Sequence, residues 1–398
     1  MEILRNIARR KLRSFLTIAG IVIGVLALTT MGSMSENFNA LLDGGVKFYG
    51  SNIQVGPPDG QSASILPLSK VDEIKQVPGV AAAFPGYGFL AKPGSLSVIS
   101  FGPPDEIIAT DPAENGWGTL KLTVTNGHYL TGTQAEVVLG ETIAKEFNKQ
   151  VGDTIDLPVK PADAKPGFVN HTFTVVGILD KTRTAPDSFA YINLADGQML
   201  LRDSLPSNLQ DAIPVTQVTE NIDVYGKPGT PIGELDKIAD RINSQVTGVK
   251  ATRPSDLVNA FKQGGFIFTA ITTVAALLAL VIGGLSVVNT MFMAVAERVR
   301  EIGLKKAVGA TTANVMWEFL AEAIVIGVIG GLIGYSLGAL ITIVANALTP
   351  PGQATLFLLD VKITVIAIGF ATALGAVAGV LPAWRAARLD PVTALRNE

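Results

Sequence analysis

The sequence predicts an α-helical membrane protein with four transmembrane helices in a one-plus-three arrangement, together with an α+β extracytoplasmic domain. Four apolar segments are each long enough to cross about 30 Å of hydrocarbon as a helix. A long polar stretch separates the first segment from the other three. Only 16% of the 398 residues are charged and 48% are hydrophobic, whereas soluble domains carry about 25% charged residues. The segments run from Ser14 to Met34, Phe266 to Ala296, Trp317 to Ala347 and Lys362 to Leu381.

The first apolar segment follows a basic N-terminus, as the core of a cleaved signal peptide also would. A signal peptide has an apolar core of about 7–15 residues and small residues at its cleavage site. This segment is longer and no A-x-A site follows it, so we interpret it as a membrane span. Residues 1–13 are expected to form a cytoplasmic amphipathic segment. Their basic residues are Arg5, Arg9, Arg10, Lys11 and Arg13.

The placement of lysine and arginine beside the spans predicts the orientation, because basic residues are retained on the cytoplasmic side. They occur before the first span, between the second and third, and after the fourth, whereas 349–360 has none. We expect a multi-pass cell (inner) membrane protein with both termini in the cytoplasm and the large domain outside. The expected boundaries are 14–47 for the first span and its stalk, 48–253 for the external domain, 254–296 for the second stalk and span, 297–314 for a cytoplasmic helix, 315–348 for the third span, 349–360 for a short external loop, 361–382 for the fourth span and 383–398 for a cytoplasmic tail.

The external domain carries both strand and helix patterns and no cysteine. Short apolar runs bounded by glycine and proline predict strands, and apolar stripes at helical spacing predict helices. The predicted strands are Ser51–Val55, Leu96–Phe101, Glu136–Leu139, Phe173–Leu179 and Phe189–Leu194. One helical stripe is Leu68, Val71, Ile74 and Val77, and the other is Ile232, Leu235, Ile238, Ile242 and Val246.

The two helical stripes indicate a weak internal repeat. Val71–Ile74 leads into Pro78-Gly79-Val80 much as Leu235–Ile238 leads into Gly248-Val249, and both regions have a β-α-β pattern. Coincidence is the alternative, since amphipathic helices ending in Gly-Val are common. If the repeat is real, the two units pair into one α+β layer. Residues of about 115–214 then form an inserted, mostly β subdomain.

The apolar pattern of the first two spans continues beyond the membrane. Phe38 and Leu42 prolong the first span, Val258 and Phe261 precede the second, and Pro254 with the polar residues after it marks a helix start. We therefore expect the first two helices to project outward as a stalk.

Small residues recur four apart within the spans, and this spacing lets helix backbones approach closely in lipid. The pattern predicts tight helix packing, either within one chain or between two. The residues are Gly20, Gly24, Gly327, Gly331, Gly334, Gly338, Gly375 and Gly379.

No charged residue lies in the middle of any span. Ionisable groups at membrane depth normally accompany an ion or proton pathway, so the sequence argues against a proton-coupled transporter. Glu318 and Glu322 lie near the cytoplasmic start of the third span. We expect them at the cytoplasmic interface with Arg385 and Arg388, facing Arg298, Lys305 or a cytoplasmic partner.

The sequence offers no catalytic, cofactor-binding or metal site. Gly334 to Gly338 matches G-x-S-x-G, but that motif needs a strand-to-helix turn and an activating histidine, and the two histidines lie in the external domain. No basic stripe indicates nucleic acid. The sequence contains no G-x-x-x-x-G-K-[ST], so we expect ATP to be used by another polypeptide.

The segment from Ala296 to Ala310 predicts a short amphipathic helix, because Glu301 and Lys305 are spaced as a helical ion pair. This segment is either a charged loop that sets the orientation of the chain in the membrane or a rigid helix to which a cytoplasmic motor protein binds.

Three motifs together resemble the MacB and FtsX family of ABC transporter permeases. They are Lys11 to Thr17 running into Gly20 to Gly24, Glu297 to Ala310, and Leu381 to Pro391. The layout of one span, an external domain and three spans is also similar to the family's. Trp384 stands where the family often has arginine, and tryptophan suits a boundary with membrane lipid.

The resemblance implies a non-catalytic permease, as a homodimer or paired with a related permease, bound to a separate ABC ATPase dimer that carries ATP and Mg. It implies that ATP binding moves the external domain for efflux or export, with a periplasmic adaptor or an extracellular accessory protein as a further partner. The alternative is an FtsX-like or lipoprotein-release-type permease that regulates a cell wall hydrolase or extracts lipoproteins. The implied ATPase-coupling residues are Arg298, Arg300, Glu301, Ile302, Gly303, Lys305 and Lys306.

Overall fold

The computed structural model describes residues 11–58, 65–93, 104–161, 167–206, 208–349 and 355–396. These residues form two compact units. The globular unit contains Asn39–Gly265 and Thr349, and the helical unit contains the other described residues. Helix α2 (Lys11–Tyr49) and helix α7 (Pro254–Glu297) each contribute residues to both units.

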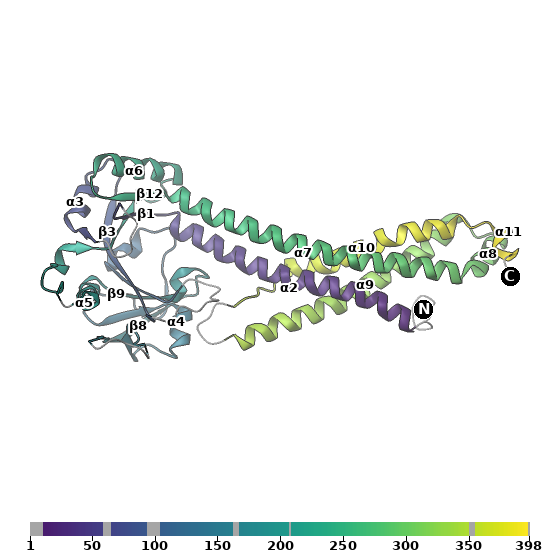
Figure 1. Ribbon diagram of the computed structural model, residues 1–398, viewed down its shortest axis with the longest axis horizontal. Helices are drawn as coiled ribbons and strands as arrows, with labels where there is room; N and C mark the ends of the chain where they lie inside the picture. The colour runs from purple at the N-terminus through teal and green to yellow at the C-terminus, as the bar shows by residue number, and fades with distance from the viewer. Residues whose placement is uncertain are drawn as a thin grey trace. The chain divides into compact units, whose positions relative to one another are not determined.

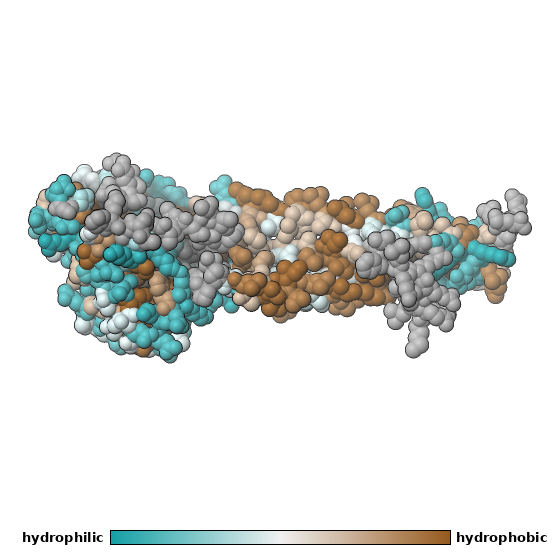
Figure 2. Space-filling view, turned by 60° about the horizontal axis from the view of Figure 1, so that its bottom comes forward, coloured by the Kyte–Doolittle hydropathy of each residue, from teal (hydrophilic) through white to brown (hydrophobic). Residues whose placement is uncertain are grey.

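The helical unit contains the predicted spans. Among the described residues, four helices are long and apolar enough to cross a membrane: α2, α7, α9 (Thr312–Leu348) and α10 (Val361–Ala387). Apolar side chains gather on the surface of these helices (Figure 2). The short α8 (Val299–Ala307) connects α7 to α9, and α11 (Pro391–Arg396) follows α10 (Figure 1). Residues expected as a tail from 383 thus form the last turn of α10 and then α11, whose proline is suited to a helix start.

Glycines bring α9 and α10 into backbone contact. A Cβ atom on Gly327 would lie 2.6 Å from the carbonyl oxygen of Ala371, and one on Gly375 would lie 2.6 Å from that of Ala323. Gly331 and Gly379 meet the Cβ atoms of Ala371 and Ala323 in the same way. Real Cβ atoms do not approach backbone this closely, so this contact requires glycine.

The other predicted glycines serve contacts with α2. Gly334 lies against Val22, and Gly338 against Thr29, while Gly20 lies against Ser286 of α7. Gly24 is also buried. All these contacts lie within one chain.

We expect Gly375→Leu to destabilise the helical unit by about 3 kcal/mol, at the upper end of overpacking costs, because the facing group is backbone and cannot rotate away. Gly369→Leu is the matched control on the same helix, since nothing lies within 4 Å of its Cβ position. Thermal unfolding of the detergent-solubilised chain, followed by circular dichroism, measures the difference. Equal melting temperatures for the two variants would contradict this account of the contact.

The globular unit is built on one ten-stranded sheet with strand order β12-β1-β11-β3-β4-β9-β6-β8-β5, in which β7 also pairs with β8. The short strands β2 (Leu66–Pro67) and β10 (Val218–Thr219) pair separately. The strands of the large sheet are β1 (Ile53–Gly56), β3 (Ala82–Leu90), β4 (Glu106–Thr110), β5 (Val124–Gly127), β6 (Glu136–Leu139), β7 (Thr154–Leu157), β8 (His171–Leu179), β9 (Phe189–Asn193), β11 (Asn221–Tyr225) and β12 (Lys250–Thr252). The predicted strand Leu96–Phe101 lies outside the described residues.

The predicted repeat is present in the topology. Helix α3 (Ser69–Lys75) joins β1 to β3, and helix α6 (Ile232–Gln245) joins β11 to β12. In the sheet, β11 lies between β1 and β3, and β1 lies between β11 and β12, so the two units interlock. Both helices bury most of their predicted apolar stripes in one core with the inward residues of these strands, whereas Ile232 is exposed.

The other half of the globular unit has its own cores and two helices that the sequence analysis missed. These are α4 (Glu141–Glu146) and α5 (Leu194–Ser204). Helix α4 is too short to show a helical period. Helix α5 contains Gly197, whose Cβ position is 2.2 Å from Ala109 Cβ, so this residue serves close packing against the sheet at the cost of helix propensity. Three short 3₁₀ turns complete the unit: η1 (Pro112–Gly116), η2 (Ala185–Ser188) and η3 (Val215–Gln217).

Candidate coupling site

Helix α8 is attached to the rest of the helical unit through one buried face. Ile302 and Gly303 are buried, and Ile302 belongs to the core of the four long helices. Helix α8 also packs against α11. Gly309 then turns the chain with a positive φ of 105°, a conformation that glycine adopts without strain, and α9 begins three residues later.

Lys306 ties α8 to the end of α10. Its Nζ donates hydrogen bonds to the carbonyl oxygens of Ala387, at 2.9 Å, and Leu389, at 2.8 Å. The last carbonyls of a helix have no partner within the helix, and a lysine beside them also complements the helix dipole. The sequence alone suggests that Lys306 is a surface charge, whereas the structure shows that it joins α8 to the end of α10.

Two further basic residues tie α8 to α9. Lys305 Nζ lies 2.7 Å from Glu318 Oε1 and 3.1 Å from Glu301 Oε1. Arg298 Nη1 lies 3.0 Å from Glu322 Oε2, and this pair is largely buried, with side chains 19% and 9% exposed. The two pairings expected for Glu318 and Glu322 are thus present.

The opposite face of α8 is left uncovered by the described residues. Arg300 and Glu301 are exposed, and Leu304 and Val308 are 58% and 83% exposed. Residues 300, 304 and 308 are four apart and share one helix face. This face, which we call the α8 outer face, combines two apolar side chains with charged neighbours.

The arginines at the end of α10 pack on aromatic rings. The guanidinium carbon of Arg385 lies 4.8 Å from the ring centroid of Phe292, and that of Arg388 lies 4.2 Å from the centroid of Trp384. Both distances are within cation–π range. Arg385 therefore links α10 to α7, rather than contributing a free charge to the α8 outer face.

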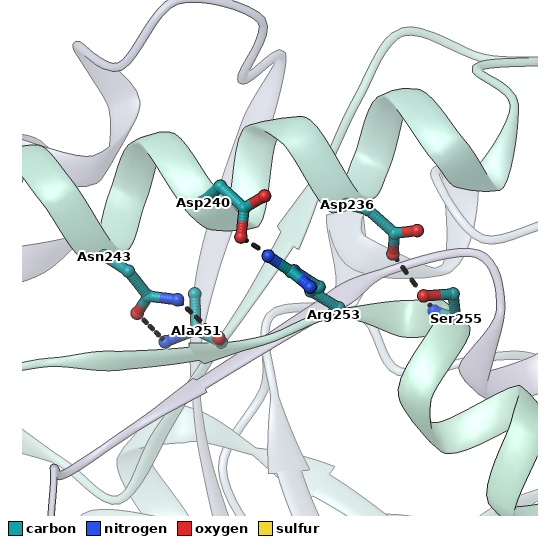
Figure 3. Close-up of polar contacts among 6 residues, drawn as sticks. All are labelled: Asp236, Asp240, Asn243, Ala251, Arg253 and Ser255. Atoms are coloured by element: carbon teal, nitrogen blue, oxygen red, sulfur yellow. Dashed lines mark hydrogen bonds and ion pairs between the residues drawn. The ribbon is translucent and has the colours of Figure 1, made fainter.

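In the globular unit, helix α6 holds the start of α7 (Figure 3). Asp236 Oδ1 accepts a hydrogen bond of 3.1 Å from the backbone N–H of Ser255, and Asp240 Oδ1 lies 2.7 Å from Arg253 Nε. Asn243 exchanges two hydrogen bonds with the backbone of Ala251, at 2.7 and 2.9 Å. Side chains of α6 thus form hydrogen bonds with both β12 and the first turn of α7.

The sequence analysis placed the start of α7 correctly at Pro254 but expected the capping groups beside it. The carboxylate that accepts from the first turn comes instead from Asp236, on α6. A capping residue so far away in sequence leaves no local pattern, so only the folded chain shows it.

We expect Asp236→Ala to loosen the first turn of α7. Losing a capping carboxylate costs about 0.5–2 kcal/mol, which corresponds to about 2- to 30-fold faster amide hydrogen exchange over residues 254–258 if local opening limits exchange. Glu234→Ala is the control, since Glu234 pairs on the same helix only with exposed Lys237. Identical exchange rates in both variants would mean that the turn is held by other groups.

The structure also contains a cavity in the globular unit, with an approximate volume of 210 Å³ and a lining of both polar and apolar side chains, to which the sequence analysis assigned no function. Two of its strands, β4 and β11, were not predicted as strands. Alternate residues of β11 line the cavity, namely Asn221, Asp223 and Tyr225, together with Glu106, Ile108, Ala109 and Thr110 of β4. This alternation was the signal available in the sequence.

Four long apolar helices and a separate globular α/β unit fit a multi-pass membrane protein. Residues 14–242 match the family model described as MacB-like periplasmic core domain, and residues 273–391 match the one described as FtsX-like permease C-terminal. The chain belongs to the MacB-like, FtsX-like family of ABC transporter permeases. Its apolar helices and periplasmic-type domain fit an inner-membrane protein with an extracytoplasmic domain.

Two similar proteins are named as export proteins. The macrolide export ATP-binding/permease protein MacB of Marinobacter nauticus is 27% identical over 420 residues, covering 99% of this chain and 60% of that protein. The pyoverdine export ATP-binding/permease protein PvdT of Pseudomonas fluorescens is 26% identical over 408 residues, covering 98% and 57%. The chain therefore spans about three fifths of the length of these relatives.

Among solved structures, the periplasmic region of MacB from Actinobacillus actinomycetemcomitans aligns with a TM-score of 0.34 and 12% identity, covering 54% of this chain and 94% of that chain.

Proposed function

We propose that this chain is the permease subunit of an ABC transporter that works with a separate ATPase and converts ATP binding and hydrolysis into movement of its extracytoplasmic domain for export. The proposal rests on one observation about helix α8. One face of α8 packs against the rest of the helical unit, and the opposite face is exposed among the described residues. The α8 outer face is the proposed contact with the ATPase.

The hydrogen bonds and ion pairs that join α8 to α9 and α10 support a role in transmitting force. Lys306 connects it to α10, and Arg298 and Lys305 connect its two ends to α9. A push on the outer face is then carried by ion pairs and buried side chains into two long helices, instead of being absorbed by a loop. Basic residues around α8 are the reason to place this end of the chain in the cytoplasm.

The proposed output is the pair of helices α2 and α7. In the helical unit, the rings of Phe38 and Phe268 are 4.5 Å apart. In the globular unit, the rings of Tyr49 and Phe261 stack at 5.5 Å. The pairing of the two helices in each unit supports their movement together as a stalk, and the cap from Asp236 supports transmission from α7 to the external domain.

We propose that the spans transmit movement across the membrane and do not form a pathway for cargo. Their middles contain no charged residue, and the glycine contacts close α9 against α10. Cargo is therefore proposed to be handled on the extracytoplasmic side. The proposed partners are an ATPase dimer with ATP and Mg, a second permease chain that is identical or related, and a periplasmic adaptor or extracellular accessory protein.

A second candidate function rests on the FtsX-like match over residues 273–391. In it, the same machinery regulates a cell wall hydrolase or extracts lipoproteins, and the external domain transmits a signal without exporting a substrate.

Purification of the complex from native membranes in mild detergent, with identification of every bound protein, tests the proposal. We expect an ATPase that contains a P-loop. An adaptor or outer-membrane channel would favour export, and a bound hydrolase would favour regulation. Recovery of the chain without any ATPase, under conditions in which its own fold is retained, would overturn both.

A further inference from the structure

The cavity in the globular unit is built by the alternation of side chains along its strands. Successive residues of a strand point to opposite faces. On β11, Ile222 and Val224 enter the core under α3 and α6, so Asp223 and Tyr225 point the other way, into the cavity. On β9, Ala190 and Ile192 enter the neighbouring core, and the two aromatic residues of that strand line the cavity.

All the charged side chains among the described lining residues are acidic. Glu106, Glu114 and Asp223 line the cavity, and none of its described lining residues is lysine, arginine or histidine. Asp223 accepts a hydrogen bond of 2.7 Å from Asn52 Nδ2. Glu114 accepts bonds from Thr110 and Tyr225. The hydrogen-bond partners of both acids are thus neutral donors, and no described basic side chain in the lining offsets a negative charge on either acid.

Burial makes this charge costly in the protein alone. Burial, followed by the nearby charge of Glu114, raises the pKa of Asp223 well above its ordinary value, against the hydrogen bond from Asn52. Burial also raises the pKa of Glu114, despite its two hydrogen bonds. A positive charge in the cavity would reverse both effects, because an opposite charge favours the ionised carboxylate.

A continuous series of aromatic rings also lines the cavity. Phe48 contacts Tyr49 and Phe189, with ring centroids 4.9 and 6.3 Å apart. Tyr191 contacts Phe189 and Tyr129, at 6.1 and 6.4 Å. Ring faces attract cations, and sites for organic ammonium ions commonly combine such rings with carboxylates.

Two buried polar atoms in the lining have no hydrogen-bond partner among the described residues. They are the hydroxyl oxygen of Tyr191 and Oδ1 of Asn52. Tyr191 is only 4% exposed and Asn52 only 9%. Buried polar atoms are nearly always paired, and an unpaired one costs stability. Because both residues line the cavity, a polar group bound there is a candidate partner for these atoms.

We propose that this cavity binds a small organic cation that carries a primary ammonium group. The carboxylates supply the countercharge, the rings supply cation–π contacts, and the free oxygen of Asn52 accepts an N–H. A quaternary ammonium ion matches the charge but has no N–H to donate. The site is independent of the contact proposed for the ATPase.

A ligand in this cavity also touches the end of helix α2. Phe48 and Tyr49 are the penultimate and last residues of α2 and line the cavity. Tyr49 in turn stacks on Phe261 of α7. A ligand in the cavity therefore contacts α2 directly. It affects α7 only through the ring of Tyr49, which stacks on Phe261.

Calorimetric titration of the full chain in lipid nanodiscs at pH 7, with phenethylamine as the probe and empty nanodiscs as the blank, tests the proposal. A primary alkylamine is protonated at this pH, as a lysine side chain is. We expect saturable binding of phenethylamine, binding at least about tenfold weaker for its trimethylammonium analogue, and none for 2-phenylethanol. No saturable heat, or equal binding of the alcohol, would overturn the proposal and leave water as the partner of these atoms.

Two variants locate the binding in the cavity. We expect Asp223→Asn to weaken phenethylamine binding at least about tenfold, and Tyr191→Phe to weaken it while raising the melting temperature of the protein without amine, because it removes an unpaired buried hydroxyl. Glu220→Gln is the control, a partly buried carboxylate of the same region that bonds Gly88 N–H. Tyr191→Phe carries the test if Asp223→Asn does not fold. Unchanged binding in Tyr191→Phe, or an equal loss in Glu220→Gln, would overturn the proposal.

Discussion

Replacing Leu304 and Val308 together with glutamate is expected to release the ATPase from the permease. Both side chains are exposed on the α8 outer face, and burying a leucine or valine at an interface contributes about 1.5–3 kcal/mol each. Losing both contributions corresponds to a fall in affinity of at least about 100-fold, since each factor of ten is about 1.4 kcal/mol. The measurement is the amount of ATPase that co-purifies with the chain.

The control for this double variant carries the same added charge elsewhere. Val151→Glu with Val169→Glu changes two exposed valines of the globular unit and is expected to leave ATPase binding unchanged. Full recovery of ATPase with the Leu304 and Val308 variant would show that the ATPase binds another surface, even though the chain remains a permease.

Arg298→Leu is expected to destabilise the helical unit by about 3–5 kcal/mol, because it leaves Glu322 buried without its partner. The double variant Arg298→Leu with Glu322→Leu is expected to recover most of this loss, since apolar residues can replace a buried ion pair at little cost. Thermal unfolding of the reconstituted chain measures all three proteins.

Lys305→Leu provides the comparison with an exposed pair. Lys305 and Glu318 are 40% and 38% exposed, and exposed pairs contribute only about 0.2–1 kcal/mol. A melting temperature for Arg298→Leu no lower than that for Lys305→Leu would contradict the buried character of the first pair. A double variant less stable than Arg298→Leu would indicate that Glu322 has a second essential partner.

Much of the fold could be predicted because it depends on local patterns. The spans follow from length and hydropathy, and the repeat from two amphipathic stripes. Pro254 marks the start of α7 because proline fits the first helical turn. Strands β6 and β9 were found because apolar residues run continuously through them, as in Glu136–Leu139.

What the sequence did not reveal depends on contacts between distant residues. Strand β11 alternates polar with apolar residues and is only five residues long, so it shows no apolar run. The role of Asp236 requires α6 beside α7, and the role of Lys306 requires the end of α10 beside α8. Carboxylates in the cavity come from β4, η1 and β11, and no spacing in the sequence brings them together.

Strand β3 joins the interlocked repeat to the rest of the globular unit. Its first half pairs with β11 and its second half with β4, and the chain returns to the same place at Thr219, whose Oγ1 donates to the carbonyl oxygen of Gly86 at 2.9 Å. The segment between Leu90 and Val218 therefore leaves and re-enters the interlocked repeat at adjacent points. We expect such a segment to be replaceable as a unit without disturbing the interlocked repeat.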